Sequence, residues 1–427
     1  MSQFHKKITE IFKSIGPGVV TGAADDDPSG IATYSQTGSQ FGYRQLWTVV
    51  LLLPFLTATQ EVCARIGAVT GQGIAAVVKA HYSRVILYGV VALVVVANTI
   101  NIGADLGAMA AATHLVLPIS VPVLTIFFTA IILLLEIFIS YKKYVKFLKW
   151  LAVSLLAYPI TLFLVKEPWG TLLQATFIPH IELNFAFLFI ITGVFGTTIS
   201  PYMFFWEASE EVEEEHEKHL IKQGKPQLTP AFLRSLRIDN FMGMMSSQIA
   251  TWCIIVVAAT VLNTNGITNI ATAADAARAL EPLVHTFPYA GFLTKLIFAT
   301  GVVGLGLLAV PVLSASASYA VAEIFDWKES LSLKLKKAQG FYAVITAATV
   351  VGLLINFIGI DPIKALVYTA VFNGVAAVPL IFIIAQIARN KKIMGEYTSG
   401  TLSHVLVWGT FAIMGATAVT MFFVIGR

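Results

Sequence analysis

Long apolar runs follow one another along nearly the whole chain, separated by short polar segments. A helix needs about 20 apolar residues to cross the hydrocarbon core of a bilayer, and eleven runs approach that length. They cover residues 17–41, 46–68, 85–116, 121–140, 144–165, 185–207, 241–262, 293–324, 342–358, 363–388 and 405–425. The pattern predicts an all-α polytopic membrane protein. Two of its spans, the first and the sixth, are interrupted by polar residues and a proline.

Composition agrees with the pattern. Of 427 residues, 57% are hydrophobic and 12% are charged, against about 25% charged in soluble domains. Cys63 and Cys253 both lie in apolar runs, so we expect neither a disulfide framework nor a metal–thiolate site. Residues 1–16 carry lysines but no short apolar core with a cleavage site. They are therefore expected to form a cytosolic N-terminal lead rather than a signal peptide.

The positive charges predict an orientation. Cytoplasmic loops of membrane proteins carry an excess of lysine and arginine. With the N-terminus in the cytoplasm, 22 of the 28 basic residues fall in cytosolic segments. An odd number of spans then puts the C-terminus outside the cell membrane. We expect a charged cytosolic loop at 207–240, and an external loop at 263–289 with a short helix at 270–284.

The interruption in the first run is the strongest chemical signal in the chain. Asp25, Asp26 and Asp27 stand in a row and are followed by Pro28 and, two residues later, by Gly30. A charged side chain at membrane depth costs at least a few kcal/mol, and irregular backbone is tolerated there only around protein or a wet cavity. This stretch predicts a cation site on an unwound helix.

The sixth run breaks in the same way, at Ser200-Pro201-Tyr202. Proline removes a backbone donor and frees carbonyls one turn earlier. Broken first and sixth spans are typical of five-plus-five inverted repeats, in which the substrate lies between the two breaks. We expect one transporter domain over 1–427, with the first repeat at 17–184, the second at 185–390 and an eleventh span in 391–427. Proline-kinked helices without a ligand are the alternative, but they leave the three aspartates unexplained.

Several motifs resemble the Nramp family of divalent metal transporters. The resemblance implies a leucine-transporter-like fold and alternating access. The motifs are Gly16-Pro17-Gly18, Asp27-Pro28-Ser29-Gly30-Ile31-Ala32-Thr33, Gly38-Ser39-Gln40-Phe41-Gly42-Tyr43, Ala64-Arg65-Ile66-Gly67-Ala68-Val69-Thr70-Gly71 and Ala104-Asp105-Leu106-Gly107.

The chain departs from the family at the residues that handle metal and protons. Where the family has Asp-Pro-Gly-Asn, this chain has Ser29 and Gly30 in the last two places, and Ser200-Pro201-Tyr202 replaces Met-Pro-His. Ala108 and Glu214 stand where the family keeps a glutamate and an arginine of its proton route. These changes resemble the Nramp-related magnesium transporters. A site of oxygen ligands alone suits hard cations, and Mg²⁺ keeps several of its waters.

The resemblance also implies the metal-binding residues. Asp27 matches the family's metal-binding aspartate, although it could equally cap the half-helix that begins near Ser29. Ala24 and Thr197 would offer carbonyls, and Ser200 would bind through a water. Gly30 would leave room for retained waters.

Other polar residues are expected to support the site. Asp25 and Asp26 have no counterpart in the family motif. Either could join the cavity, face a polar neighbour or act only through its charge. Asn98, Asn101 and Asp105 recur on one helical face, as an interhelical hydrogen-bond stripe or, for Asp105, as part of the inner path. The remaining candidates are Tyr202 at the break, Glu207 and Glu211 in an acidic vestibule, and Tyr368, Thr369 and Asn373 in span ten. Glu136 is expected to pair with Lys142 or Lys143.

These residues favour transport of Mg²⁺, and of Mn²⁺, without proton coupling. The partners are then the transported ion and the lipid bilayer, with no cofactor, no catalytic residue and no nucleic acid. A proton-coupled Mn²⁺/Fe²⁺ symporter is one alternative. An organic-solute symporter of the same fold is another, although three aspartates would repel a substrate carboxylate. A membrane-embedded prenyltransferase would need a second aspartate cluster and basic residues for diphosphate.

Overall fold

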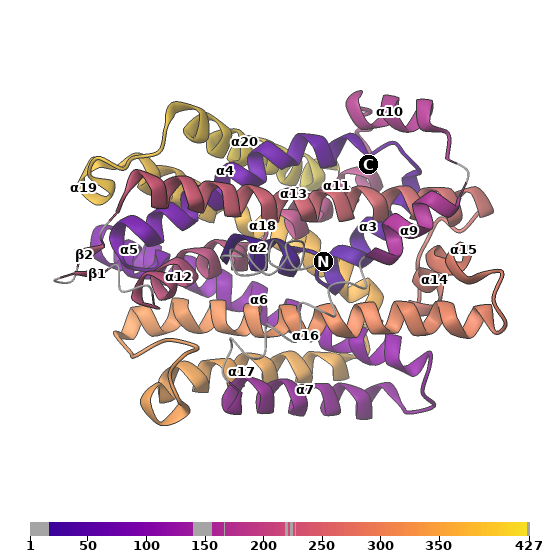
Figure 1. Ribbon diagram of the computed structural model, residues 1–427, viewed down its shortest axis with the longest axis horizontal. Coiled ribbons are helices and arrows are strands. Elements are labelled where there is room, and N and C mark those ends of the chain that lie inside the picture. The colour runs from indigo at the N-terminus through magenta and orange to yellow at the C-terminus, as the bar shows by residue number, and fades with distance from the viewer. Residues whose placement is uncertain are drawn as a thin grey trace, which may run out of the picture.

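The protein is almost entirely helical, and its helices run along one long axis (Figure 1). The structure is a computed structural model that describes residues 17–139, 156–165, 167–217, 221–222, 225–226 and 228–424. A two-residue hairpin, β1 (Ile221–Lys222) with β2 (Lys225–Pro226), is the sheet present in these ranges. The helices are α2 (Pro17–Asp25), α3 (Pro28–Phe41), α4 (Trp47–Thr70), α5 (Ile74–His81), α6 (Arg84–His114), α7 (Val121–Phe138), α9 (Ala157–Leu164), α10 (Trp169–Phe177), α11 (Phe185–Thr198), α12 (Pro201–Glu217), α13 (Pro230–Val261), α14 (Ala273–Ala277), α15 (Glu281–Val284), α16 (Ala290–Phe325), α17 (Gln339–Ile355), α18 (Pro362–Arg389), α19 (Lys391–Met394) and α20 (Thr401–Val424).

Nine of the eleven expected spans are present as long apolar helices in the described residues. Nine helices there are long and apolar enough to cross a membrane, with α11 and α12 counted together. The first expected span is divided between α2 and α3, which lie in the centre of the bundle (Figure 1). Of the expected fifth span, 144–165, only α9 lies within the described part of the chain, and the lead at 1–16 lies outside it.

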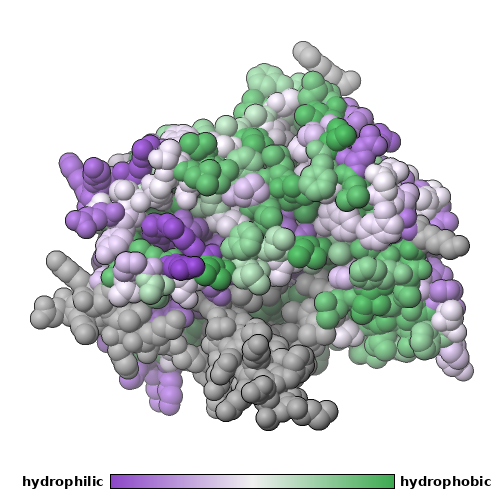
Figure 2. Space-filling model, turned by 45° about the horizontal axis from the view of Figure 1, so that its top comes forward, coloured by the Kyte–Doolittle hydropathy of each residue, from purple (hydrophilic) through white to green (hydrophobic). Residues whose placement is uncertain are grey.

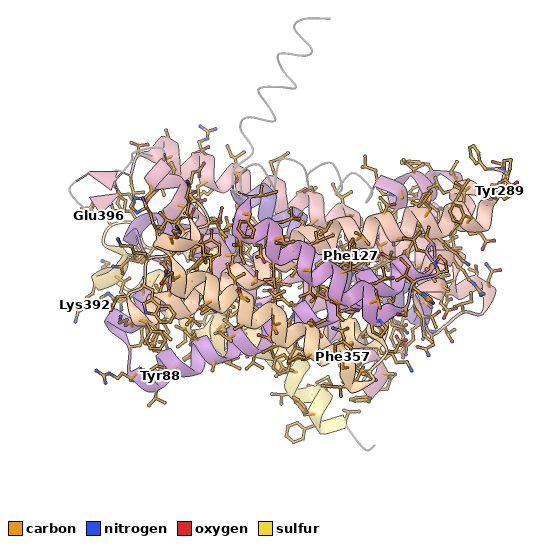
Figure 3. All side chains as sticks on the ribbon, turned by 90° about the horizontal axis from the view of Figure 1, so that it is seen from below. Tyr88, Phe127, Tyr289, Phe357, Lys392 and Glu396 are labelled. Atoms are coloured by element: carbon orange, nitrogen blue, oxygen red, sulfur yellow. The ribbon has the colours of Figure 1, made fainter. Side chains whose placement is uncertain are left out.

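The surface fits a lipid environment. Large apolar side chains such as Phe127 and Phe357 are more than half exposed, and both lie between the two ends of the molecule (Figure 3). Tyr289 lies at one end, and Lys392 and Glu396 lie at the other (Figure 3). Figure 2 shows hydrophobic residues spread over the flank and hydrophilic residues mostly toward the ends. An apolar belt of this kind is what a bilayer would cover.

Both helix breaks fall where the sequence predicts them. Asp26 and Asp27 separate α2 from α3, and Ile199 and Ser200 separate α11 from α12. Each second half begins at a proline, a residue whose fixed φ suits the first helical position and whose missing N–H costs nothing there. The two breaks are therefore local consequences of Pro28 and Pro201.

Two expected boundaries differ from the structure. The seventh span was expected to begin at residue 241, but α13 already begins at Pro230 because the Thr229 side chain accepts a hydrogen bond from the Phe232 N–H and caps it. In place of one helix at 270–284, the external segment contains α14 and α15 joined by a short 3₁₀ turn.

Close helix packing holds the broken spans in place. The two halves of the first span pack against α13, and α11 packs against α18. Gly196 makes the second contact possible, because a Cβ at this position would lie 2.0 Å from the carbonyl oxygen of Ala370. Small residues at such crossings let backbones approach in membrane bundles. The breaks are thus fixed against continuous helices.

Candidate metal site

Asp27 caps the second half of the first span. Its Oδ1 accepts hydrogen bonds from the Gly30 N–H at 2.7 Å and from the Ser29 hydroxyl at 2.6 Å. A capping carboxylate satisfies donors that the first turn of a helix leaves free. The capping interpretation is confirmed, and it leaves the second carboxylate oxygen turned toward another helix.

That second oxygen meets Asn101 on α6. The Asn101 Nδ2 donates to Asp27 Oδ2 at 3.0 Å and to Asp105 Oδ2 at 3.1 Å, so one amide joins two carboxylates. Its Oδ1 accepts from the Nδ2 of Asn373 at 3.1 Å. The sequence places Asn101 and Asp105 on one helical face, but nothing in it indicates that this face contacts Asp27. Asn98 instead donates to the Leu313 carbonyl at 2.9 Å.

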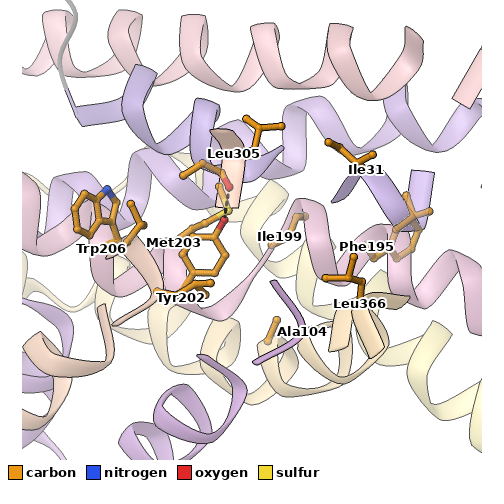
Figure 4. Close-up of a cluster of buried hydrophobic side chains, with 14 of the residues drawn as sticks. Ile31, Ala104, Phe195, Ile199, Tyr202, Met203, Trp206, Leu305 and Leu366 are labelled. Atoms are coloured by element: carbon orange, nitrogen blue, oxygen red, sulfur yellow. Dashed lines mark hydrogen bonds between the residues drawn. The ribbon is translucent and has the colours of Figure 1, made fainter. Parts of the chain in front are cut away.

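The second break lies directly against the first. The Ser29 hydroxyl is 3.2 Å from the Thr197 hydroxyl. The Tyr202 hydroxyl donates to the Ala24 carbonyl at 2.9 Å, and Figure 4 shows a dashed line at this hydroxyl. The carbonyl expected to be free at Ala24 therefore already accepts one hydrogen bond. The Ser200 hydroxyl is buried and has no hydrogen-bond partner among the described residues. A buried, unpaired hydroxyl at a helix break is a ready ligand for a water or an ion.

The other two aspartates turn toward α13. The Ser247 hydroxyl donates to Asp25 Oδ2 and lies 3.4 Å from Asp26 Oδ1. Asp25 Oδ1 has no hydrogen-bond partner in the described part of the chain. The three adjacent carboxylates thus divide between two sides, with Asp27 toward α6 and the other two toward α13.

The site concentrates negative charge in a dry setting. Asp25, Asp26, Asp27 and Asp105 are each at most 2% exposed, and none forms an ion pair with a described lysine or arginine. Apolar side chains from α3, α6, α11, α12, α16 and α18 surround the breaks (Figure 4). Buried charge without a counter-charge is costly, and a bound cation would offset that cost.

The donor set is made of oxygen. Across the described residues, no three histidine, cysteine, aspartate or glutamate side chains are arranged to hold a metal ion by themselves. An ion between the breaks would take its remaining ligands from hydroxyls, carbonyls and water. Such a mixed set suits a hard divalent cation that keeps part of its hydration shell.

A hollow of about 350 Å³ opens on one side of the site, between α3, α11 and α18. It is lined by Gln36, Phe189 and Tyr368, and the Gln36 Oε1 accepts from the Ile270 N–H at 2.9 Å. Tyr368 is half exposed in this hollow, and the Thr369 hydroxyl donates to the Ala365 carbonyl. Within the described residues, no hydrogen bond joins Tyr368 or Thr369 to the breaks, whereas Asn373 reaches Asp27 through Asn101.

The opposite side of the site carries further carboxylates on α12. Glu207 accepts hydrogen bonds from Thr21 on α2 and from the Asn240 Nδ2 on α13. Glu211 and Glu215 follow at one-turn spacing and are 2% and 1% exposed. Neither Glu211 nor Glu215 forms an ion pair with a described residue. These three glutamates form an acidic face that begins about two helical turns beyond the break.

Glu136 on α7 has a partner among the described residues that the sequence did not indicate. Its Oε1 accepts from the Ser314 hydroxyl on α16 at 2.6 Å, which places the carboxylate between two helices. Lys142 and Lys143, the expected partners, lie outside the described residues. The sequence favoured a neighbour close in the chain, and the packing of α7 on α16 provided one much farther along it.

Comparison with known families decides the identity of the chain. The sequence profile described as "Natural resistance-associated macrophage protein-like", abbreviated Nramp, matches residues 18–424. The chain belongs to the Nramp family. The recognition made from the broken first span is therefore confirmed over nearly the whole chain.

Relatives in the Nramp family share low identity over almost full length. A divalent metal cation transporter MntH of Caldanaerobacter subterraneus subsp. tengcongensis is 25% identical over 407 residues, covering 94% of this chain and 90% of that protein. An MntH of Listeria monocytogenes is 22% identical over 431 residues, covering 98% and 91%. These relatives are named as transporters and not as enzymes.

Solved structures confirm the fold. A manganese transporter of Eremococcus coleocola matches with a TM-score of 0.73 at 15% identity, covering 96% of this chain and 85% of that one. MhsT, solved with L-phenylalanine, matches with a TM-score of 0.62 at 12% identity and covers 95% and 98%. The Nramp chain described here therefore has the leucine-transporter-like architecture that its two broken spans predict.

Proposed function

We propose that this protein carries divalent metal cations across the cell membrane by alternating access, with Mg²⁺ as its principal cargo and Mn²⁺ accepted. The observation that carries the proposal is the pair of breaks itself. Asp27, the neighbouring hydroxyls and the unpaired Ser200 hydroxyl lie together in a buried, oxygen-only setting. The family and the names of the relatives support divalent cations in general.

The preference for Mg²⁺ rests on the donor types. Ser200 and Gly30 stand where the family keeps a methionine and an asparagine, so the thioether that suits softer metals is replaced by a hydroxyl. The smaller side chains leave space for waters, and Mg²⁺ gives up its waters reluctantly. We propose that the ion is held by Asp27, by the carbonyls of Ala24 and Thr197, and by Ser200 through a water.

The route for the ion follows the same geometry. On one side, the hollow beside Gln36 lies between α3, α11 and α18 and would admit the ion. On the other side, Glu207, Glu211 and Glu215 extend away from the break along α12. An acidic path attracts cations and raises their local concentration. The hydrogen bond from Thr21 to Glu207 holds α2 against α12. Release on the acidic side requires that contact to open.

The membrane potential is sufficient to drive this transport. At 100 mV a divalent cation gains about 4.6 kcal/mol on entering a negative interior, twice the value for one elementary charge. Tyr202, Ala108 and Glu214 replace residues that the family uses for protons. We therefore propose uniport into the cell, with the N-terminus in the cytoplasm and the C-terminus outside.

The decisive experiment compares ions in one preparation. Purified protein in liposomes, with an inside-negative potential, should take up Mg²⁺ and Mn²⁺. Ca²⁺ is tested beside them, and empty liposomes give the background. Uptake of Mn²⁺ without Mg²⁺ would contradict the Mg²⁺ assignment, and uptake of neither ion would overturn the function.

A second candidate is a proton-coupled Mn²⁺ or Fe²⁺ symporter. The manganese transporter among the similar structures favours it, although a likeness at 15% identity shows only the fold. The two candidates differ in the pH of the vesicle interior during uptake, because a symporter brings protons into the vesicle with each ion. An amino-acid symporter, suggested by the likeness to MhsT, is disfavoured because the four buried aspartates would repel a substrate carboxylate.

A further inference from the structure

A second hollow of about 520 Å³ lies at one end of the molecule, away from the helix breaks. It is bordered by the turn between α4 and α5, by α12, by the last turns of α16 and by residues 329–333. Figure 1 shows α5, α12 and this end of α16 gathered near β1 and β2, opposite α10, α14 and α15. Three carboxylates line it: Glu213, Glu323 and Glu329.

Glu323 is the most buried of the three, at 6% exposure. Its Oε2 accepts a 2.8 Å hydrogen bond from the Ala76 N–H in the first turn of α5. Its Oε1 has no hydrogen-bond partner among the described residues. Gly73 makes room for this oxygen, since a Cβ there would lie only 1.7 Å from it. The start of α5 is thus shaped around this carboxylate, which the backbone N–H groups of Gly73, Ala75 and Ala76 face.

The other two carboxylates lie close enough to interact with Glu323. Burial, with Glu323 and Glu213 nearby, raises the pKa of Glu329 to about 9, and one of its oxygens has no hydrogen-bond partner in the described ranges. Glu213 Oε1 accepts from the Tyr319 hydroxyl and from the Leu331 N–H. Three acidic groups therefore share one cavity, and burial together with repulsion between their charged forms accounts for the raised pKa of Glu329.

No described basic side chain forms an ion pair with Glu323 or Glu329. Lys79 is nearby, but its Nζ contacts Asp326 Oδ2 and donates to the backbone carbonyl of Glu323. Lys79 therefore does not pair with the side chain of either cavity carboxylate. This separates the cavity from an ordinary surface salt-bridge network.

We propose that this cavity binds a hydrated divalent cation, with Glu213, Glu323 and Glu329 accepting hydrogen bonds from its waters. A water occupies about 30 Å³, so six waters around an ion fit the volume. Mg²⁺ is usually bound with several of its waters retained. In the described part of the chain, no three side chains are placed to ligate a metal directly, so binding through waters is the mode that fits. The identity of the ion rests on the proposed function, whereas the existence of the site does not.

Counting bound Mn²⁺ on the purified full-length protein tests the site. Free Mn²⁺ gives a paramagnetic resonance signal that disappears on binding, so the stoichiometry is measured without transport. Asp27→Asn is expected to remove the ion between the breaks and to leave one Mn²⁺ bound per chain. Adding Glu329→Gln or Glu323→Gln to that variant is expected to weaken the remaining binding about 10-fold or more, as loss of an outer partner does at metal sites.

The variants are chosen to separate binding from folding. Gln at 323 keeps an oxygen acceptor for Ala76, and Glu329 lies outside the helices. Glu396→Gln, an exposed glutamate at the same end (Figure 3), is the matched control and should leave binding unchanged. Absence of bound Mn²⁺ in Asp27→Asn, or unchanged affinity in both double variants, would overturn the proposal. Failure of liposome uptake with this stoichiometry intact would count against the transport function alone.

Discussion

The hydroxyl of Tyr202 donates a 2.9 Å hydrogen bond to the carbonyl oxygen of Ala24, and this bond joins the two broken spans. Tyr202 lies in the first turn of α12, and Ala24 lies in the last turn of α2. Both are buried. Because the helix break leaves the Ala24 carbonyl without its helical donor, the tyrosine satisfies it and holds α2 against α12.

Tyr202→Phe is expected to loosen the contact between α2 and α12. The substitution keeps the ring but leaves a buried carbonyl unpaired, which costs about 1 kcal/mol or more. A Ser200→Cys reporter should then react about 5-fold faster with a membrane-permeant thiol reagent, because 1 kcal/mol changes a population ratio by about that factor. The two native cysteines, Cys63 and Cys253, are buried. Their labelling in the protein without the reporter gives the background rate.

Tyr342→Phe is the control for Tyr202→Phe. The Tyr342 hydroxyl also donates to a backbone carbonyl, that of Leu333 at 2.8 Å, but far from the breaks. Equal labelling rates in the two variants would show that the bond to Ala24 does not hold α2.

Asp27 has two roles that substitution can separate. Asp27→Ala removes both the cap of α3 and the charge, and loss of a cap costs about 1 kcal/mol. Asp27→Asn keeps an oxygen for Ser29 and Gly30 but removes the charge. Both variants should lower apparent cation affinity by about 100-fold, the equivalent of about 3 kcal/mol for a charged contact.

Thermal unfolding distinguishes the two substitutions at Asp27. Asp27→Asn should unfold close to the wild-type temperature, and Asp27→Ala should unfold earlier. If Asp27→Asn transports normally, the residue is a cap and not a ligand.

Asn101→Ala is expected to weaken cation uptake, although Asn101 is not one of the proposed ligands of the ion. The amide of Asn101 orients Asp27 and Asp105, and loss of such an orienting partner typically costs 10–100-fold in metal affinity. The readout is the cation concentration at half-maximal uptake. Asn98→Ala is the control, because Asn98 lies one turn away on α6 and bonds to the Leu313 carbonyl instead.

The acidic face of α12 is expected to control release. Replacing Glu211 and Glu215 together by glutamine should lower the maximal uptake rate about 10-fold, at the low end of electrostatic focusing, with little change in half-saturation. The effect should shrink as ionic strength rises. Glu281→Gln, an exposed change on α15, should be silent. If the double variant and Glu281→Gln lost the same fraction of the uptake rate, α12 would not line the release route.

Uptake is expected to leave the vesicle interior at constant pH. With Tyr202, Ala108 and Glu214 at the positions of the family's proton route, we expect no proton to accompany the cation. A pH-sensitive dye trapped in the liposomes measures this during Mg²⁺ and Mn²⁺ entry, with the potential clamped by a K⁺ gradient and valinomycin. Acidification that depends on the metal would identify a symporter.

The sequence by itself determined the spans, both breaks and the capping role of Asp27. Each depends on a few neighbouring residues: apolar length sets a span, and Pro28 and Pro201 end one helix and begin the next. The Nramp motifs lie in the same local stretches. These features were therefore predictable from the chain, and the structure has both breaks where they were expected, whereas the seventh span begins earlier, at Pro230.

Only the tertiary structure decided which polar groups meet. Three hydrogen bonds join distant helices: Asn101 donates to Asp27, Ser247 donates to Asp25, and Ser314 donates to Glu136. In the same way, Glu213 and Glu323 line one cavity. Each pair joins helices far apart in the chain. Periodicity places a side chain on a helical face, but the rotation and packing of that helix against its neighbours decide what the face contacts. That information is spread over all the helices of the bundle.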